Sequence, residues 1–158
     1  MKKLFLIFNC FALLGVLKAQ GPLFQWAKTT DAISTNGGNE GRCITHDASG
    51  NIYTTGYFTG TANFDPGLAT YSLTASAWDT FILKLDAAGN FIWAKNIGAV
   101  GSITNPRGIA VDITGNVYIT GYYDTIVDFD PGPGIFNLTP NGSNDVFILK
   151  LNATGNFV

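Results

Sequence analysis

The stretch Gly50-Asn51-Ile52-Tyr53-Thr54-Thr55-Gly56-Tyr57 decides the fold, because it returns 65 residues later as Gly115-Asn116-Val117-Tyr118-Ile119-Thr120-Gly121-Tyr122. Each copy follows an Asp-x-x-Gly-Asn turn and has the composition of a β-strand with a glycine inside it. Three further segments repeat at offsets of 65 to 67 residues: Trp26-Ala27-Lys28 with Trp93-Ala94-Lys95, Phe64-Asp65-Pro66-Gly67 with Phe129-Asp130-Pro131-Gly132, and 79–85 with 145–151. The chain therefore contains two copies of one unit.

Two tight turns divide each unit into strands. They begin at Asp47, Asp86, Asp112 and Asn152, and a glycine follows three residues later. The first side chain caps the turn and the glycine takes positive φ, which is typical of a hairpin with a glycine bulge. Two hairpins in each unit predict four strands: 42–47, 51–58, 80–86 and 90–97 in the first unit, and 107–112, 116–123, 146–152 and a strand from 156 in the second.

The predicted strands carry apolar side chains on both faces. Val117 and Ile119 point to one face, and Tyr118 and Tyr122 point to the other. A sheet that is apolar on both sides needs a neighbour on each side, which indicates the four-stranded antiparallel blades of a β-propeller. We predict an all-β fold with a lead-in strand and loop at 20–41, a first blade at 42–97 and a second, truncated blade at 98–158.

Two details refine this prediction. Trp26 and Trp93 fall on fourth strands, so Phe24–Thr29 is expected to be a lone strand of that type and the rings are expected to fill gaps between blades. Gly56 and Gly121 are expected where blades converge. The last strand stops at Val158, so we expect a fragment of a longer protein with further blades.

The segment Gly-Ile-Ala-Val-Asp-Ile-Thr-Gly-Asn-Val-Tyr-Ile-Thr-Gly-Tyr (108–122), with Asp-Val-Phe-Ile-Leu-Lys-Leu at 145–151, resembles the SBBP β-propeller repeat of exported bacterial proteins. The resemblance covers nearly the whole chain after residue 19. It implies a propeller within a large surface or secreted protein, and it implies no catalytic residues.

The first 19 residues have the pattern of a secretory signal peptide. Lys2-Lys3 precedes an apolar run from Leu4 to Leu17, and Ala19-Gln20 offers a cleavage point. The run is shorter than the roughly 20 residues that span a membrane. We therefore expect a secreted or cell-surface protein with no membrane span after cleavage. Cleavage leaves six basic and eleven acidic side chains, a net charge of −5, which argues against nucleic acid as a partner.

Few residues suit catalysis. His46 is the only histidine and aligns with Val111, and Cys43, which aligns with Gly108, is expected to be a small buried side chain. No Ser/His/Asp set exists without His46, and no Cys/His pair has metal-ligand spacing. We predict no catalytic and no cofactor-binding residues. The charged residues that both units share are given structural roles: Arg42 and Arg107 in ion pairs with Asp79 and Asp145, and Lys84 and Lys150 in polar contacts between blades.

The long connections at 59–78 and 124–144 carry oxygen-bearing side chains, which calcium prefers. The candidates for a metal site are Asn63, Asp65, Asp128 and Asp130. Asp-Pro-Gly is also turn chemistry, and Ala62 and Phe64 with Tyr71 and Leu73 predict a small hairpin around it. Because both units contain this motif, the turn is the better interpretation.

The long connections all lie at one edge of the predicted blades, where binding residues usually gather. Polar or aromatic side chains there that differ between the units are the candidates for binding: Asn36, Asn39, Glu40, Asn63, Trp78, Asp124 and Asp128. Of these, Trp78, Glu40 and Asp124 are the predicted ligand-binding residues. An exposed Trp78 ring can stack on a sugar or a protein partner, or it can cap the blade edge.

These observations favour an exported, non-enzymatic binding or scaffold module, with an extracellular glycan or protein as partner. The alternative is the propeller part of a secreted glycan hydrolase or lyase whose catalytic residues lie outside this segment. We also expect the two units alone to self-associate, aggregate or melt at low temperature, because roughly three stacked repeats are needed for a sufficient core.

Overall fold

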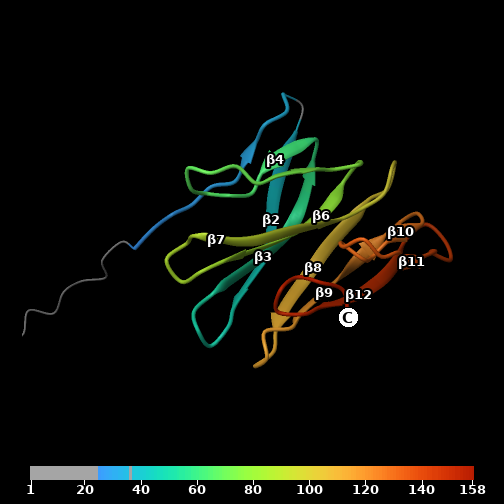
Figure 1. Cartoon of the computed structure of the whole chain (residues 1–158). Coiled ribbons are helices and arrows are strands. Elements are labelled where there is room, and N and C mark those ends of the chain that lie inside the picture. Colours follow the sequence, from blue (N-terminus) through green and yellow to red (C-terminus); the bar gives the residue numbers. More distant parts are fainter. Residues whose placement is uncertain (1–24, 36) are drawn as a thin grey trace, which may run out of the picture.

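The computed structural model describes residues 25–158 except 36, and all regular structure in these residues is β (Figure 1). The predicted signal peptide lies outside the described residues. Two larger antiparallel sheets dominate. Blade one contains β2 (Gly38–His46), β3 (Ile52–Thr59), β6 (Asp79–Leu85) and β7 (Phe91–Ile97) in that spatial order, and blade two contains β8 (Thr104–Val111), β9 (Val117–Tyr123) and β12 (Asp145–Leu151). The all-β prediction is confirmed.

Two small sheets branch from the connections at the loop edge. β4 (Thr61–Asn63) pairs with β1 (Asp31–Ala32) and with β5 (Ser72–Thr74), as the predicted small hairpin requires. The same excursion in the second unit pairs β10 (Val127–Asp128) with β11 (Asn137–Leu138). Among the described residues, no helix is long and apolar enough to cross a bilayer.

Two predicted fourth strands differ from the structure. The strand expected from residue 156 contributes a single bridge between Leu151 and Phe157. Of the strand expected at Phe24–Thr29, residue 24 lies outside the described residues and 25–30 form no strand. The prediction of a strand there is wrong because a strand requires backbone hydrogen bonds to a neighbouring strand, and 25–30 make none to another described residue.

The four tight turns form as predicted. Gly50, Gly89, Gly115 and Gly155 have φ between 79° and 82°. At the first turn, Asp47 Oδ1 accepts hydrogen bonds from the amides of Ser49 (2.9 Å) and Asn51 (3.0 Å). The Tyr53 hydroxyl donates to Asp47 Oδ2 (3.1 Å), and burial together with this bond raises the pKa of Tyr53 to about 12. The turn is thus tied to the strand that follows it.

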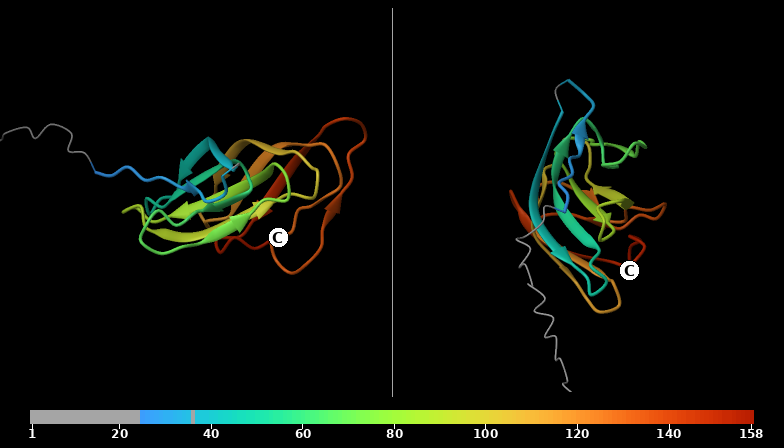
Figure 2. Two further views of the ribbon diagram at one scale, coloured as in Figure 1. Left: turned by 90° about the horizontal axis from the view of Figure 1, so that it is seen from above. Right: turned by 90° about the vertical axis from the view of Figure 1, so that its left-hand side faces the viewer.

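The two blades stack face to face, with β8 lying against β2 and β3 (Figures 1 and 2). We call the face that carries Ile82 or Ile148 the forward face of a blade, and the face that carries Leu83 or Leu149 the rear face. Tyr53, Ile82 and Ile97 on the forward face of blade one form one core with the rear face of blade two, which contributes Val117, Ile119, Tyr123, Phe147, Leu149 and Leu151. Fully burying side chains of this size stabilises the stack by about 1.5–3 kcal/mol each.

The rear face of blade one has its own core. The β4–β5 excursion folds back over it, so that Ala62 and Phe64 pack on Phe81 and Leu83. Phe64 contacts Phe58 edge-to-face at 5.1 Å between ring centroids, and Tyr123 and Phe129 repeat this contact at 5.3 Å in the second unit. In each unit, the excursion from the loop edge therefore covers part of the rear face of its own blade.

The two mid-strand glycines serve a different purpose from the one predicted. A Cβ at Gly56 would lie 1.8 Å from the carbonyl oxygen of Glu40, and one at Gly121 would lie 2.2 Å from that of Asn105. Both acceptors belong to the neighbouring strand of the same sheet, beside a β-bulge. Close approach is thus confirmed, but it occurs within each blade, because the bulge pushes the adjacent backbone over the glycine.

Candidate functional site

Trp78 lies where the β5–β6 connection meets the β7–β8 connection. The Trp78 amide donates to Ser102 O (3.2 Å), and the Thr104 amide donates to Trp78 O (2.9 Å). These bonds form a parallel bridge between Trp78 and Ile103. The Trp78 backbone is therefore fixed at the loop edge by the segment that joins the two blades, while its side chain is 45% exposed.

Glu40 and Trp78 both contact Tyr57. Glu40 pairs with Tyr57 across β2 and β3, which places both side chains on one face. The Tyr57 hydroxyl donates a hydrogen bond to Glu40 Oε2. The Tyr57 and Trp78 rings lie with their centroids 5.0 Å apart at an interplanar angle of 33°. Tyr57 therefore links the two candidates that the sequence identified.

Arg42 completes this group. Its Nε lies 3.2 Å from Glu40 Oε1, and its guanidinium carbon lies 5.1 Å from the Tyr57 ring centroid. The hydrogen bond to Glu40 raises the pKa of the Tyr57 phenol above its ordinary value. The edge cluster, as we call Glu40, Arg42, Tyr57 and Trp78, thus combines an aromatic pair with a carboxylate and a guanidinium.

The edge cluster borders a shallow hollow of about 200 Å³. Its lining residues come from the ends of β2 and β3 and from Trp78: Gly38, Asn39, Glu40, Tyr57, Thr59 and Trp78. Pockets for drug-sized ligands measure roughly 300–1,000 Å³. The hollow therefore suits one ring of a larger molecule that runs along the surface.

Asp124 lies one step away from the cluster. Its Oδ1 accepts a hydrogen bond from the Ile103 amide (2.7 Å). Ile103 forms the β-bridge to Trp78, so the hydrogen bond from Ile103 to Asp124 fixes the segment against which the Trp78 backbone is bonded. The structure thus brings Glu40 and Trp78 together and places Asp124 as their support.

Comparison with protein families gives one match: residues 92–122 match the model of the SBBP repeat, described as a β-propeller repeat. The chain carries the SBBP β-propeller repeat. The resemblance seen in the sequence is confirmed over these residues, which run from β7 through β8 to β9 and so join the two blades. Comparisons with curated proteins and with solved structures return no match.

The predicted ion pairs of the two arginines are wrong. Arg42 pairs with Glu40, and the guanidinium carbon of Arg107 lies 5.5 Å from the Tyr122 ring centroid. Asp145 Oδ2 accepts a hydrogen bond from the Asn141 amide (2.7 Å). Arg42 and Arg107 are the unpaired residues of the two bulges and lie over the Tyr57 and Tyr122 rings. The aspartates begin the next strand opposite Phe58 and Tyr123, whose side chains point to the other face of the sheet.

Asp79 accepts hydrogen bonds from amide groups instead of pairing with an arginine. It is 1% exposed and accepts hydrogen bonds from the amides of Ser76 (3.2 Å) and Ala77 (3.4 Å) and from Asn96 Nδ2 (3.0 Å). Burial raises the pKa of Asp79 above its ordinary value. Its role is to close the turn that leads into β6.

The metal candidates are also used by backbone groups. Asn63 Oδ1 accepts from the amides of Asp65 (3.0 Å) and Tyr71 (2.8 Å). Asp128 Oδ1 accepts in the same way from Asp130 (3.0 Å) and Phe136 (2.8 Å). Asp65 and Asp130 each accept from a glycine amide at 2.7 Å. Within the described part of the chain, no group of three or more His, Cys, Asp or Glu side chains gathers as a metal site would require.

The remaining shared residues contribute to the blade interface. Lys84 Nζ donates to Ala153 O (3.4 Å) of the second blade, as predicted, while Lys150 Nζ lies 5.6 Å from the ring centroid of Tyr118 in its own blade. Cys43 is half-buried rather than buried, and its Sγ contacts Arg107 O (3.1 Å) across the blades. His46 contacts only the adjacent Asp47 carbonyl through Nδ1 (3.0 Å) among the bonds of the described residues.

Asn39, another of the predicted candidates, lies on the opposite face of the sheet, where its Nδ2 donates to Thr30 O (3.2 Å). Sequence reasoning missed Tyr57 and Arg42 as members of the edge cluster. Tyr57 recurs as Tyr122, and shared residues were given structural roles. The positions that make the first unit distinct are its neighbours, because Asn105 aligns with Glu40 and Asn144 aligns with Trp78. The useful signal was the cross-strand pairing of Glu40 with Tyr57, which the predicted strand at 42–47 began too late to include.

Proposed function

We propose that this chain is part of an exported, non-enzymatic β-propeller whose loop edge binds an extracellular glycan. The edge cluster is the observation that supports this proposal. An exposed aromatic ring can stack on the apolar face of a sugar, while the carboxylate and guanidinium groups beside it can bond to the hydroxyls. The SBBP repeat is the scaffold, and further blades are implied because a propeller ring needs roughly four to eight.

Export rests on the signal-peptide pattern of residues 1–19. A binding role without catalysis is supported by the bonds of Glu40, whose two carboxylate oxygens are engaged by Tyr57 and Arg42. Glycosidases require two carboxyl groups on either side of the scissile bond, and the edge cluster supplies one. The alternative, that this propeller belongs to a secreted hydrolase or lyase, places the catalytic residues elsewhere in a longer polypeptide.

The test is a screen of the secreted chain against soluble oligosaccharides, followed by calorimetric titration of any that bind. Trp78→Ala is expected to weaken binding about tenfold, because stacking contributes roughly 0.5–1.5 kcal/mol beyond the buried area. Phe136→Ala is a matched control: Phe136 is 48% exposed and stacks on Phe157 at 4.8 Å and 36°, in the excursion of the second unit.

Binding that Trp78→Ala and Phe136→Ala reduce equally would contradict the assignment of the edge cluster. Binding of a protein and of no glycan would move the partner to another class. Release of reducing sugar from a bound oligosaccharide would favour the enzymatic alternative.

A further inference from the structure

The edge cluster contains one part that both units share and another part that only the first unit has. Arg107 lies over the Tyr122 ring at 5.5 Å, as Arg42 lies over the Tyr57 ring at 5.1 Å. The stack of a guanidinium on a tyrosine ring therefore forms in both units, whatever stands beside it. It belongs to the bulge that the two blades have in common.

The first unit adds a carboxylate and an indole to this stack. Glu40 stands where the second unit has Asn105, and Trp78 stands where it has Asn144. Both additions contact Tyr57, Glu40 through the hydroxyl and Trp78 through the ring. A carboxylate and aromatic faces beside one another are the groups that bind an ammonium ion.

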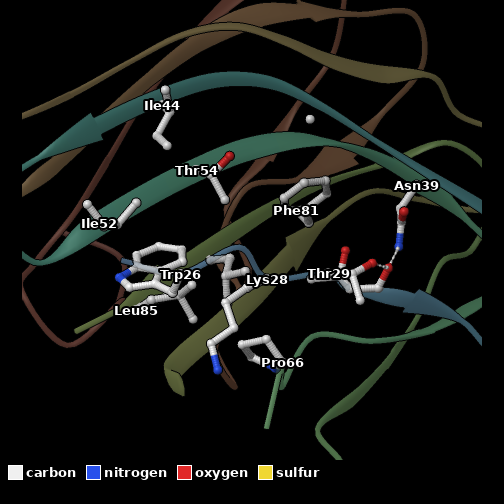
Figure 3. Close-up of a pocket in the computed structure, with 13 residues that line it drawn as sticks. Trp26, Lys28, Thr29, Asn39, Ile44, Ile52, Thr54, Pro66, Phe81 and Leu85 are labelled. Carbon is white, nitrogen blue, oxygen red and sulfur yellow. Dashed lines mark hydrogen bonds between the residues drawn. The ribbon is translucent and has the colours of Figure 1, made fainter. Parts of the chain in front are cut away.

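The hollow beside the edge cluster has the same character. Among the described residues that line it, Glu40 is the one with a charged side chain, and the others are Gly38, Asn39, Tyr57, Thr59 and Trp78. The Asn39 amide takes no part, because it donates to Thr30 O on the opposite face of blade one, beside the lead-in segment (Figure 3). The described lining thus offers a carboxylate and two aromatic rings without a cation.

Glu40 can accept further hydrogen bonds. Its Oε2 accepts from the Tyr57 hydroxyl, and its Oε1 lies 3.2 Å from Arg42 Nε. An ionised carboxylate has about four lone-pair sites, of which these contacts use about half. The Glu40 side chain is 49% exposed and that of Arg42 is 32% exposed, so the carboxylate is the more accessible member of the pair.

The hollow stays open beside a stacked blade. Tyr57 pairs across the sheet with Thr80, which forms two hydrogen bonds with Thr104 of blade two (2.8 and 3.0 Å). The face that carries Tyr57 is therefore the one that blade two already covers, and Trp78 at its edge is still 45% exposed. A further blade would stack on the rear face of blade one or on the forward face of blade two, so it would leave the hollow accessible.

On the basis of the glycan-binding function proposed above, we propose that the ligand of the edge cluster is a cationic glycan, which carries free amino groups on its sugar rings. A sugar ring stacks on Trp78, and its ammonium group donates to the Glu40 carboxylate beside the Tyr57 ring. A glycan with hydroxyl groups alone gains the stacking but no cation–π contact, so it binds more weakly. A glycan with carboxylate groups is repelled by the like charge of Glu40.

Calorimetric titration of the secreted chain with two matched oligosaccharides tests this substrate class. One is a short oligomer of glucosamine, and the other is the glucose oligomer of the same length and linkage, which has a hydroxyl in place of each ammonium group. The glucosamine oligomer is expected to bind at least about tenfold more tightly, because it adds a cation–π contact and a charge-assisted hydrogen bond. Raising the ionic strength from about 0.1 M to about 1 M shortens the Debye length from about 10 Å to about 3 Å, so it should reduce this preference.

Two variants separate the charge from the stacking. Glu40→Gln removes the charge and keeps an oxygen that accepts from the Tyr57 hydroxyl, so both oligomers should then bind with similar affinity. Trp78→Ala should weaken the binding of both oligomers. Asp31→Asn is the matched control, because it removes one negative charge from β1, outside the lining of the hollow, and it should keep the preference for glucosamine.

Equal affinity of the native chain for the two oligomers, or tighter binding of an acidic glycan, would overturn the substrate class and leave the glycan-binding function standing. A loss of preference in Asp31→Asn as large as in Glu40→Gln would also overturn it, because the charge of the whole chain would then be responsible. Absence of binding to any glycan in the screen would contradict the proposed function itself. The two proposals can therefore fail separately.

Discussion

Ile82 and Ile148 occupy the same position in the two units, yet Ile82 is fully buried and Ile148 is 79% exposed. Both side chains point to the forward face of their blade, and both lie within nearly identical strands. The difference arises from the neighbour alone: blade two covers Ile82 with Ile119, Leu149 and their surroundings.

The same mutation should therefore destabilise the protein strongly at position 82 and hardly at all at position 148. Ile82→Ala is expected to lower the free energy of unfolding by about 2–5 kcal/mol, because it leaves a cavity in a packed core. Ile148→Ala should change it by less than about 0.5 kcal/mol. Urea unfolding followed by circular dichroism measures both. Equal losses would show that blade two does not cover blade one.

Gly56 should tolerate no side chain. Gly56→Ala would place a Cβ 1.8 Å from Glu40 O and 2.8 Å from the Phe81 ring, so β2 and β3 must separate. We expect a loss of at least about 1–3 kcal/mol in the free energy of unfolding. Gly41→Ala is the control in the same sheet, since a Cβ at Gly41 meets nothing within 4 Å. Similar melting temperatures for the two variants would contradict the close approach at the bulge.

The turn aspartates should make folding sensitive to acid. Hydrogen bonds from the side chains of Thr114 and Asn116 hold the pKa of Asp112 well below its ordinary value. A carboxyl group with a lowered folded-state pKa stabilises the fold above its unfolded pKa of about 3.9, and this stability is lost as the pH falls through the folded-state pKa. Asp112→Asn should therefore flatten the loss of stability below about pH 4.

Asn152 shows that the substituted turn can still form, because its Oδ1 accepts from the amides of Thr154 (3.0 Å) and Asn156 (3.1 Å). Thermal melts between pH 2 and pH 7 measure the effect. Asp31→Asn, which changes the net charge equally outside these turns, is the control and should leave the acid slope as it is. An unchanged slope for Asp112→Asn would show that this turn does not contribute to it.

The signal peptide can be tested without reference to the fold. When the full chain is produced in a bacterium, the exported product is expected to begin at or near Gln20, as read by mass spectrometry. Leu13→Arg interrupts the apolar run and should keep the protein inside the cell at its full mass. Asn9→Leu, which lengthens the apolar run, should leave export intact. A full-length exported product would contradict cleavage after Ala19.

The sequence was sufficient to predict the repeat, the tight turns and the seven long strands. These features depend on local interactions that recur in both units. An Asp or Asn side chain caps each turn, a glycine takes positive φ, and apolar residues occupy both faces of each strand. The candidates Trp78 and Glu40 could be found because they differ between two otherwise similar units.

Tertiary structure decided the rest. Arg42 turns toward Glu40 and Tyr57 rather than Asp79 because a bulge sets which face it takes, and the same bulge explains why position 56 is a glycine. Two identical isoleucines become core and surface because burial belongs to the neighbouring blade rather than to the strand. Local sequence specifies which residues can be covered, and only the arrangement of the sheets in space specifies which of them are.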